Sequence, residues 1–331
     1  MDIIFVRHKL HALIVINLIA ENFISKNFIF VRQHWKEINE DSEKNDFFYK
    51  MLEEKAFYTI HTVEQRGLIK SVIQIYLLSI LAFISSGKFY LAAITSYAYA
   101  IVTKLNPLLK IITFDDGMSN IKKDSHNPYF SNKALDDNFS ILRSFLIFLF
   151  PDGTSSFMRK KTILHYTIYN DFENIVPREK LKYIKIDWES YLSNEDILCL
   201  NRFLKSEVSL LIGTVFPETT HSRLQDERKR NFVKNFQKEF LPKFDLIISH
   251  PRDSSSFSRL KISRNFHGLA ESVIRFLQNQ SMVKQINVYH FKSTAILTIK
   301  TLSKVKLYDI FADSDDIEDN SAFREPVAPN N

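Results

Sequence analysis

Residues 1–31 read MDIIFVRHKLHALIVINLIAENFISKNFIFV, and this stretch decides the fold class. The apolar run at 3–6 is typical of a buried parallel strand, the pattern over 8–22 is helical, and 28–31 is a second apolar run. A strand, a helix and a second strand in this order open a doubly wound α/β sheet. We therefore predict an α/β protein whose sheet starts with these residues.

The same alternation continues along the chain. Further strands are predicted at 110–114, 162–169, 183–186, 208–212, 246–249 and 285–288, with helical segments between them. A series of this length in 331 residues fits two Rossmann-like domains that face a cleft better than it fits one sheet. We place the first domain at 1–160 and the second at 161–311, and we expect the acidic segment 312–331 to be disordered.

The most hydrophobic stretch, 71–86, is about 16 residues long and contains Gln74. A membrane-spanning helix needs ~20 predominantly apolar residues, so we predict a buried helix here. The first residues lack the basic and apolar pattern of a signal peptide. Cys199 is the only cysteine, which excludes an intrachain disulfide and favours a reducing compartment. These features predict a cytoplasmic protein.

The net charge of +6 is concentrated in one part of the chain. Residues 221–267 contain 11 Lys or Arg against 5 Asp or Glu, which accounts for the whole excess. Such a concentration indicates an anionic partner, which could be a nucleotide, a phosphorylated glycan or a membrane surface, or else a solvated basic helix. We expect peripheral contact with the inner membrane and no nucleic-acid partner, and the sequence leaves a homodimer open.

Three polar motifs follow predicted strands, where ligands bind in doubly wound sheets. In Asp115-Asp116-Gly117 the adjacent side chains point to opposite sides, so one carboxylate can face a ligand. Burial beside the other acid would raise its pKa, as a general base requires. In His250-Pro251 the proline holds the histidine rigidly where it can donate to a phosphate. Ser293-Thr294 offers hydroxyls and backbone amides at a helix start, an arrangement that binds anions.

Each motif is also compatible with an ordinary turn, strand end or helix cap when it is taken alone. Together and in this order, the three motifs resemble those of the bacterial sialyltransferases, especially glycosyltransferase family 52, the lipooligosaccharide sialyltransferases. The turn Gly213-Thr214 is similar to the family's Leu-Gly-Gln turn, with Thr214 in place of Gln. Glu271 matches the acidic residue that holds the donor's ribose. The N-terminus departs from the family, since Arg7-His8 stands where Thr-Pro is frequent.

The resemblance implies a GT-B type fold, CMP-sialic acid as donor, a terminal sugar such as galactose of a surface glycan as acceptor, and inversion without metal or cofactor. The sequence itself also favours a reaction without a metal ion. Metal-dependent glycosyltransferases commonly carry Asp-X-Asp at a strand end, and here this spacing occurs only in the acidic tail, at Asp313-Ser314-Asp315. A donor with a single phosphate could be neutralised by His250, the two hydroxyls and nearby basic residues such as Arg252.

The catalytic roles implied by the resemblance fall to three residues. Asp116 or Asp115 would take the acceptor proton, and His250 would act on the departing CMP. Glu218 and Asp226, in the loop after Gly213, are alternative bases. The expected substrate-binding residues are Gly117, Gly213, Thr214, Pro251, Arg252, Glu271, Ser293 and Thr294.

Two other functions fit parts of the pattern. A capsule-type polysialyltransferase shares the acid–acid–Gly and His-Pro motifs, but such chains tend to be longer. A non-catalytic protein of the same fold that binds glycans or a membrane surface would not need the motifs intact. Release of CMP from CMP-sialic acid distinguishes an enzyme from a binding protein.

Overall fold

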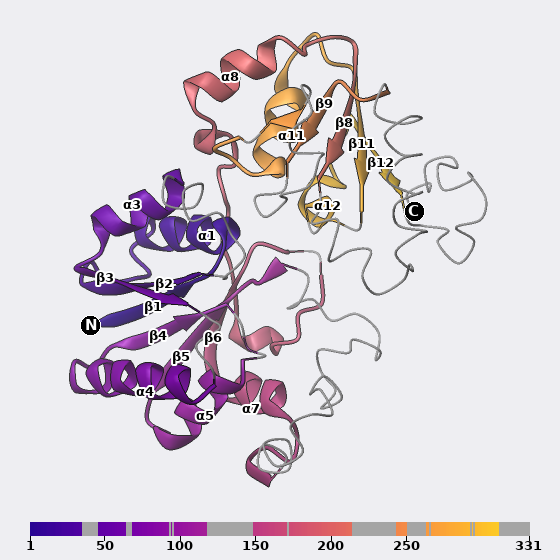
Figure 1. Ribbon diagram of the computed structural model, residues 1–331. Coiled ribbons are helices and arrows are strands. Elements are labelled where there is room, and N and C mark those ends of the chain that lie inside the picture. Colours follow the sequence, from indigo (N-terminus) through magenta and orange to yellow (C-terminus); the bar gives the residue numbers. More distant parts are fainter. Residues whose placement is uncertain are drawn as a thin grey trace, which may run out of the picture. The chain divides into compact units, whose positions relative to one another are not determined.

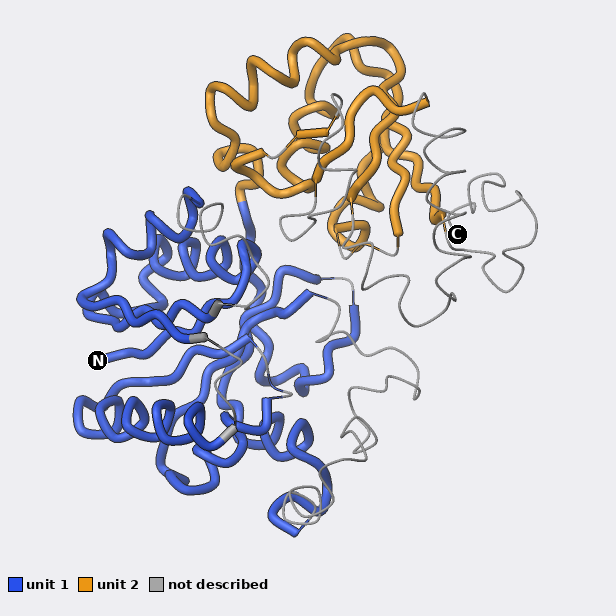
Figure 2. Tube along the Cα trace, viewed as in Figure 1, with its two compact units in different colours: residues 1–186 blue, residues 187–331 orange. Residues whose placement is uncertain are grey.

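The computed structural model describes residues 1–34, 46–63, 68–92, 94, 96–117, 148–170, 172–213, 243–249, 263–264, 266–291, 293 and 295–310. The chain divides into two compact units, Met1–Ile186 and Asp187–Asn331 (Figure 2). Each unit contains one parallel sheet with helices packed against it (Figure 1). The predicted α/β class, with two doubly wound sheets, is confirmed, whereas the cleft between the units stays a prediction.

The first unit has a seven-stranded sheet in the order β3-β2-β1-β4-β5-β6-β7, and all neighbouring strands are parallel. The order reverses between β1 and β4, which makes this the topological switch point of the sheet. Its elements are β1 (Asp2–Val6), α1 (Lys9–Ala20), β2 (Phe28–His34), α3 (Phe47–Lys55), β3 (Tyr58–Val63), α4 (Leu68–Ile84), β4 (Lys88–Leu91), α5 (Tyr97–Leu105), β5 (Lys110–Phe114), α7 (Thr154–Lys161), β6 (Thr162–Thr167), η6 (Arg178–Lys180) and β7 (Leu181–Tyr183).

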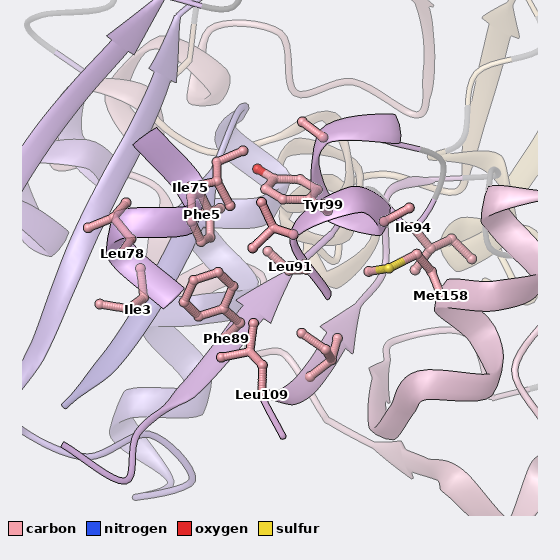
Figure 3. Close-up of a cluster of buried hydrophobic side chains, with 14 of the residues drawn as sticks. Ile3, Phe5, Ile75, Leu78, Phe89, Leu91, Ile94, Tyr99, Leu109 and Met158 are labelled. Carbon is pink, nitrogen blue, oxygen red and sulfur yellow. The ribbon is translucent and has the colours of Figure 1, made fainter. Parts of the chain in front are cut away.

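The helices cover both faces of this sheet. α1 and α3 lie on one face, and α4, α5 and α7 lie on the other (Figure 1). On the second face the core is formed by strand residues such as Phe5, Phe89 and Leu91, which pack against Ile75 of α4 and Tyr99 of α5 (Figure 3). The central strands β1, β4 and β5 are buried on both faces, and this explains why they are almost continuously apolar in sequence.

The strand β6 contains one irregularity that matters for the site. Its pairing with β5 joins Ile111 to Thr162 but Ile112 to Leu164, so Ile163 is an extra residue on the β6 side. Ile163 is half exposed. From this point the register places His165 beside Thr113.

The expected boundary between the domains differs from the structure. We expected the second domain to start at 161, but β6 and β7 pair with β5 and extend the first sheet. The first compact unit therefore continues to Ile186. The sequence shows where these strands lie but not which sheet they join, because that choice depends on long-range pairing.

The helix predicted at 71–86 is buried on only one of its sides, so the prediction of a buried helix is wrong for the other side. The helix exists as α4, and Ile75, Leu78 and Ala82 are buried in the core. Its other side exposes large apolar side chains, among them Ile69 at 76% and Ile84 at 75%. None of the helices in the described ranges is long and apolar enough to cross a membrane.

The second unit has a five-stranded sheet in the order β10-β9-β8-β11-β12, again with parallel neighbours. Its switch point lies between β8 and β11. Its elements are η7 (Glu189–Tyr191), α8 (Asn194–Asn201), β8 (Glu207–Ile212), β9 (Leu246–Ile248), β10 (Ser263–Arg264), α11 (Ala270–Asn279), β11 (Gln285–His290), α12 (Ile296–Ile299) and β12 (Val305–Asp309). The acidic segment 312–331 lies outside the described residues.

A capping box starts α8 and also fixes the segment before α11. Ser193 accepts a hydrogen bond from the Asp196 amide, and the Asp196 carboxylate accepts one from the Ser193 amide. The same carboxylate accepts from the backbone N–H of His267. At Gly268 a Cβ would come within 2.8 Å of the Ser272 Cβ, so only glycine allows this close approach. The start of α11 is thus held against α8.

Candidate active site

The two aspartates after β5 point in opposite directions, as expected for adjacent residues at a strand end. Gly117, which follows them, has a φ of 57°, in the left-handed region that glycine adopts without strain. It turns the chain away from the strand directly after Asp116. As a result, Asp115 and Asp116 have different partners on different elements.

Asp115 is fully buried, and its two carboxylate oxygens are occupied. One lies 3.0 Å from His165 Nε2 on β6, and the other accepts a hydrogen bond of 2.7 Å from the Ile168 amide. The other ring nitrogen of His165 lies 2.8 Å from the Thr113 hydroxyl on β5. We expected Asp115 as a catalytic residue, and the structure contradicts this because the carboxylate is closed to any substrate. It joins β5 to β6 and positions the loop that carries Asp116.

Asp116 meets two histidines from the start of α1. Its Oδ1 lies 2.8 Å from His11 Nε2 and 3.3 Å from His8 Nε2. The Nδ1 of His11 accepts a hydrogen bond of 3.3 Å from the Arg7 backbone N–H. This assigns the proton of a neutral His11 to Nε2, so His11 donates to Asp116. We call these three side chains, His8, His11 and Asp116, the His-Asp cluster.

The His-Asp cluster sets the charge of Asp116. Burial alone would raise the pKa of its carboxyl, but the electrostatic interaction and hydrogen bond with His11 and the electrostatic interactions with His8 and Arg7 outweigh burial. The pKa is therefore held well below its usual range. We expected a raised pKa, and this was wrong because Asp115 points away from Asp116 and is itself paired. An ionised carboxylate of low pKa is a good hydrogen-bond acceptor and a weak general base.

The same cluster has the composition of a metal site. Its three candidate ligand atoms lie within 4.8 Å of one another. However, a metal would need the lone pair on His11 Nε2, where the Arg7 N–H bond to Nδ1 places the proton. The hydrogen bond to Asp116 already satisfies this nitrogen. The three side chains therefore fit a hydrogen-bonded cluster that stabilises the ionised Asp116 better than they fit a metal-binding site.

In the second unit two predicted residues, Gly213 and Ser293, lie at or near the carboxyl edge of the sheet. Gly213 directly follows β8 and donates its backbone N–H to Ile248, and Ser293 follows the neighbouring strand β11. The Ser293 hydroxyl accepts a long 3.4 Å contact from the Ala295 amide, as in a local cap. The following helix, α12, has only four residues, so its dipole contributes little to anion binding.

Glu271 lies in the first turn of α11 and is almost completely buried. Burial raises the pKa of Glu271 to about 7, against the opposing effects of a backbone hydrogen bond and the Arg275 charge. Its carboxyl is thus partly protonated near neutral pH and can both donate and accept hydrogen bonds. This suits contact with a pair of sugar hydroxyls.

The remaining predicted residues cannot be placed. Thr214, Glu218, Asp226, His250, Pro251, Arg252 and Thr294 lie outside the described residues. Sequence reasoning missed the roles of His8, His11 and His165. A signal was present in the spacing of His8 and His11, three residues apart where a strand meets a helix, but nothing local indicates that they meet a residue more than 100 positions away.

Two parallel sheets, each covered by helices and each with polar residues at its carboxyl edge, define a doubly wound α/β protein. The family model for glycosyltransferase family 52 matches residues 34–313, and the chain belongs to this family. It is therefore a glycosyltransferase. The predicted resemblance to the bacterial sialyltransferases of this family is confirmed.

One similar relative is the N-acetyllactosaminide alpha-2,3-sialyltransferase of Neisseria meningitidis serogroup A. It is 24% identical over 278 residues, which cover 81% of this chain and 68% of the relative. Similar solved structures include a glycosyltransferase from Rickettsia africae (TM-score 0.38, 11% identity, 93% of this chain and 73% of that chain). A UDP-N-acetylglucosamine 2-epimerase from Rickettsia bellii is also similar (TM-score 0.42, 14% identity, 87% and 74%). At these values the two structures carry no conclusion about function.

Proposed function

We propose that the protein transfers sialic acid from CMP-sialic acid to a terminal sugar, galactose, of a surface glycan such as lipooligosaccharide. The observation that carries this proposal is the match to the family model, which extends over both units. The name of the similar Neisseria protein, a sialyltransferase, supports it. The transfer inverts the anomeric centre and uses no metal or cofactor. CMP-sialic acid and a glycan are then the two substrates.

The donor would bind to the second unit. Gly213 and Ser293 lie beyond neighbouring strands at the switch point, and Glu271 lies at the start of α11, where its carboxyl can bind the ribose hydroxyls. Thr214, Pro251, Arg252 and Thr294 would complete the site around the phosphate. His250 would donate a proton or hydrogen bond to the departing CMP.

The acceptor would bind to the first unit at the His-Asp cluster, with Gly117 at the turn beside it. Asp116 is ionised and accepts hydrogen bonds, so it can orient the acceptor hydroxyl. Asp116 stays the base in this proposal, although its low pKa makes it a weak one. Glu218 and Asp226 are the alternative bases.

The experiment that tests the function measures CMP release and product formation. Purified protein is incubated with CMP-sialic acid and, separately, with UDP- and GDP-sugars, each with lactose or N-acetyllactosamine. We expect CMP release and a sialylated product only with the first donor. CMP should also raise the melting temperature by mass action, more than UDP or GDP does. Equal stabilisation by UDP or GDP would contradict the donor assignment.

The two alternatives give different results in the same assay. A polysialyltransferase would extend an acceptor that already ends in sialic acid and give products of several lengths. A non-catalytic binding protein would release no CMP beyond the rate of the uncatalysed reaction. We propose a cytoplasmic enzyme that attaches reversibly to the inner membrane, and a homodimer is compatible with this function.

A further inference from the structure

The outward side of α4 is unusual for a helix that covers a sheet. Its inward side belongs to the core through Ile75 and Leu78 (Figure 3). Such helices normally carry polar residues on the opposite side. In α4 most of that side is apolar, and its exposed large apolar residues are Ile69, Ile73, Tyr76, Leu77, Ile80, Leu81, Phe83 and Ile84. The only charged residue of the helix is Lys70.

The neighbouring helix α5 adds further exposed apolar side chains. α4 packs against α5, and α5 packs against α7, so the three helices form one layer (Figure 1). The last turn of α5 exposes Leu105, and the loop after it exposes Leu108. We call the exposed side of α4, α5 and α7 the outer helical face. A concentration of exposed large apolar side chains on one layer of helices indicates a site of interaction.

The outer helical face is also positively charged. Residues 68–114 contain four Lys and no Asp or Glu, and residues 148–161 contain three Lys or Arg and one Asp. That acid, Asp152, is paired with Lys160 at 2.8 Å. Five of these seven basic residues belong to the three helices, and the other two, Lys88 and Lys110, begin the strands β4 and β5. The five are Lys70, Lys104, Arg159, Lys160 and Lys161. A partner must therefore combine an apolar surface with negative charge.

We propose that the outer helical face docks on a bilayer that contains anionic lipids. Such a bilayer supplies acyl chains for the apolar side chains and negative headgroups for the lysines. α4 would lie in the plane of the interface, because its inner side is held in the core and only its outer side is available. A second copy of the chain fits less well, since a two-fold interface would bring two basic faces together, and Asp152, the one acid among the residues counted above, is already paired with Lys160.

The docking surface deepens the peripheral attachment proposed above, and it does not depend on the identity of the sugar donor. α4 follows β3, so its first turn lies near the carboxyl edge of the sheet, the edge at which Asp116 follows β5. A bilayer on the outer helical face would thus run beside the acceptor site. If the proposed function holds, a glycan anchored in that bilayer reaches the site without leaving the membrane.

The test measures co-sedimentation of the full-length protein with vesicles, without any sugar donor. One set contains phosphatidylglycerol and phosphatidylethanolamine, and the other contains phosphatidylcholine alone. We expect binding to the anionic vesicles that weakens at high salt, and little binding to the neutral ones. The double variant Leu77→Gln/Ile84→Gln should lower the partition coefficient by about ten-fold or more, because each side chain removes apolar area from the interface.

A matched control carries the same chemical change elsewhere. Leu198 and Met282 of the second unit are exposed to a similar extent, 64% and 59% against 62% and 75% for Leu77 and Ile84. The variant Leu198→Gln/Met282→Gln should bind vesicles as the parent does. A charge variant on the three helices, Lys70→Gln/Arg159→Gln/Lys161→Gln, should lose the salt-sensitive part of the binding. Circular dichroism and melting temperature show that each variant is folded.

Three results would overturn the proposal. These are equal binding of the Leu77/Ile84 variant and the parent, equal binding to neutral and anionic vesicles, and a loss of self-association instead of vesicle binding in that variant. The last result would assign the face to a second copy of the chain. Because CMP release from a soluble acceptor is measured separately, failure of the docking surface and failure of the sialyltransferase assignment are distinguishable.

Discussion

The buried carboxyl of Glu271 should make the stability of the protein depend on pH, and the substitution Glu271→Gln should remove this dependence. The pKa of Glu271 is raised from 4.5 to about 7 because the group is buried. A raised carboxyl pKa means that the folded state holds the proton more tightly than the unfolded state. The contribution is therefore fully present below pH 4.5 and is lost as the pH rises through about 7.

The size of the effect follows from the same two values. A pKa difference between 4.5 and about 7 corresponds to roughly 3 kcal/mol of unfolding free energy, at about 1.4 kcal/mol for each pH unit. This is an upper value, since the buried group can relax or admit water when it ionises. We expect the parent to lose ~1–3 kcal/mol more than the Gln variant between pH 4.5 and pH 8.

The assay is denaturant unfolding of both proteins at these two pH values. Titration of all other groups cancels in the difference between parent and variant. Glu195→Gln is the matched control, because Glu195 is exposed in the first turn of α8. The control should leave the pH dependence unchanged. If Glu271→Gln keeps the full pH dependence of the parent, the carboxyl is not desolvated as described, and its assignment to the ribose loses its physical basis.

Four further predictions concern the two aspartates and the chemistry. Asp116→Asn should bind CMP as the parent does but transfer sialic acid about 10²-fold or more slowly. His250→Ala should lose transfer and also lower the affinity for CMP in a calorimetric titration. Near-normal transfer by Asp116→Asn would show that another residue is the base. His11→Gln should raise the pKa of Asp116 and shift the acid limb of the pH–rate profile to higher pH, and an unmoved limb would separate that limb from Asp116. Asp115→Asn should lower the unfolding free energy by about 2–4 kcal/mol, since it disturbs a buried pair with His165; unchanged stability would show that the pair is not structural. EDTA should leave transfer unchanged, and loss of activity restored by magnesium or manganese would contradict the metal-free mechanism.

The parts of the fold that the sequence predicts well are those with strong local patterns. The opening strand, helix and strand and the strand at 110–114 were predicted correctly because apolar runs and helical periodicity are local signals. The strands β3, β10 and β12 were missed. They lie at or next to the edges of their sheets and carry polar and charged residues, so their pattern is weak. Long-range pairing decides which position in a sheet such strands occupy.

The candidate site shows the same division. The position of Asp115-Asp116 at a strand end was predicted, and so was the divergence of the two side chains. Their partners were not predicted, because His11 lies 105 residues and His165 50 residues from the aspartate that each contacts. The predicted direction of the Asp116 pKa shift was wrong for this reason. The neighbouring acid is adjacent to Asp116 in sequence, whereas the histidines are adjacent to it in space.

The extra residue in β6 shows where this strand tolerates a change of length. Thr162 pairs with Ile111 and Leu164 with Ile112, so a strand without Ile163 would pair regularly with β5 and still place His165 beside Thr113. Side chains alternate across a strand, so an insertion between Leu164 and His165 would instead turn His165 to the other face and remove the imidazole from the Asp115 carboxylate. In any alignment or redesign of this strand, a gap at 163 is therefore less damaging than a change of length directly after it.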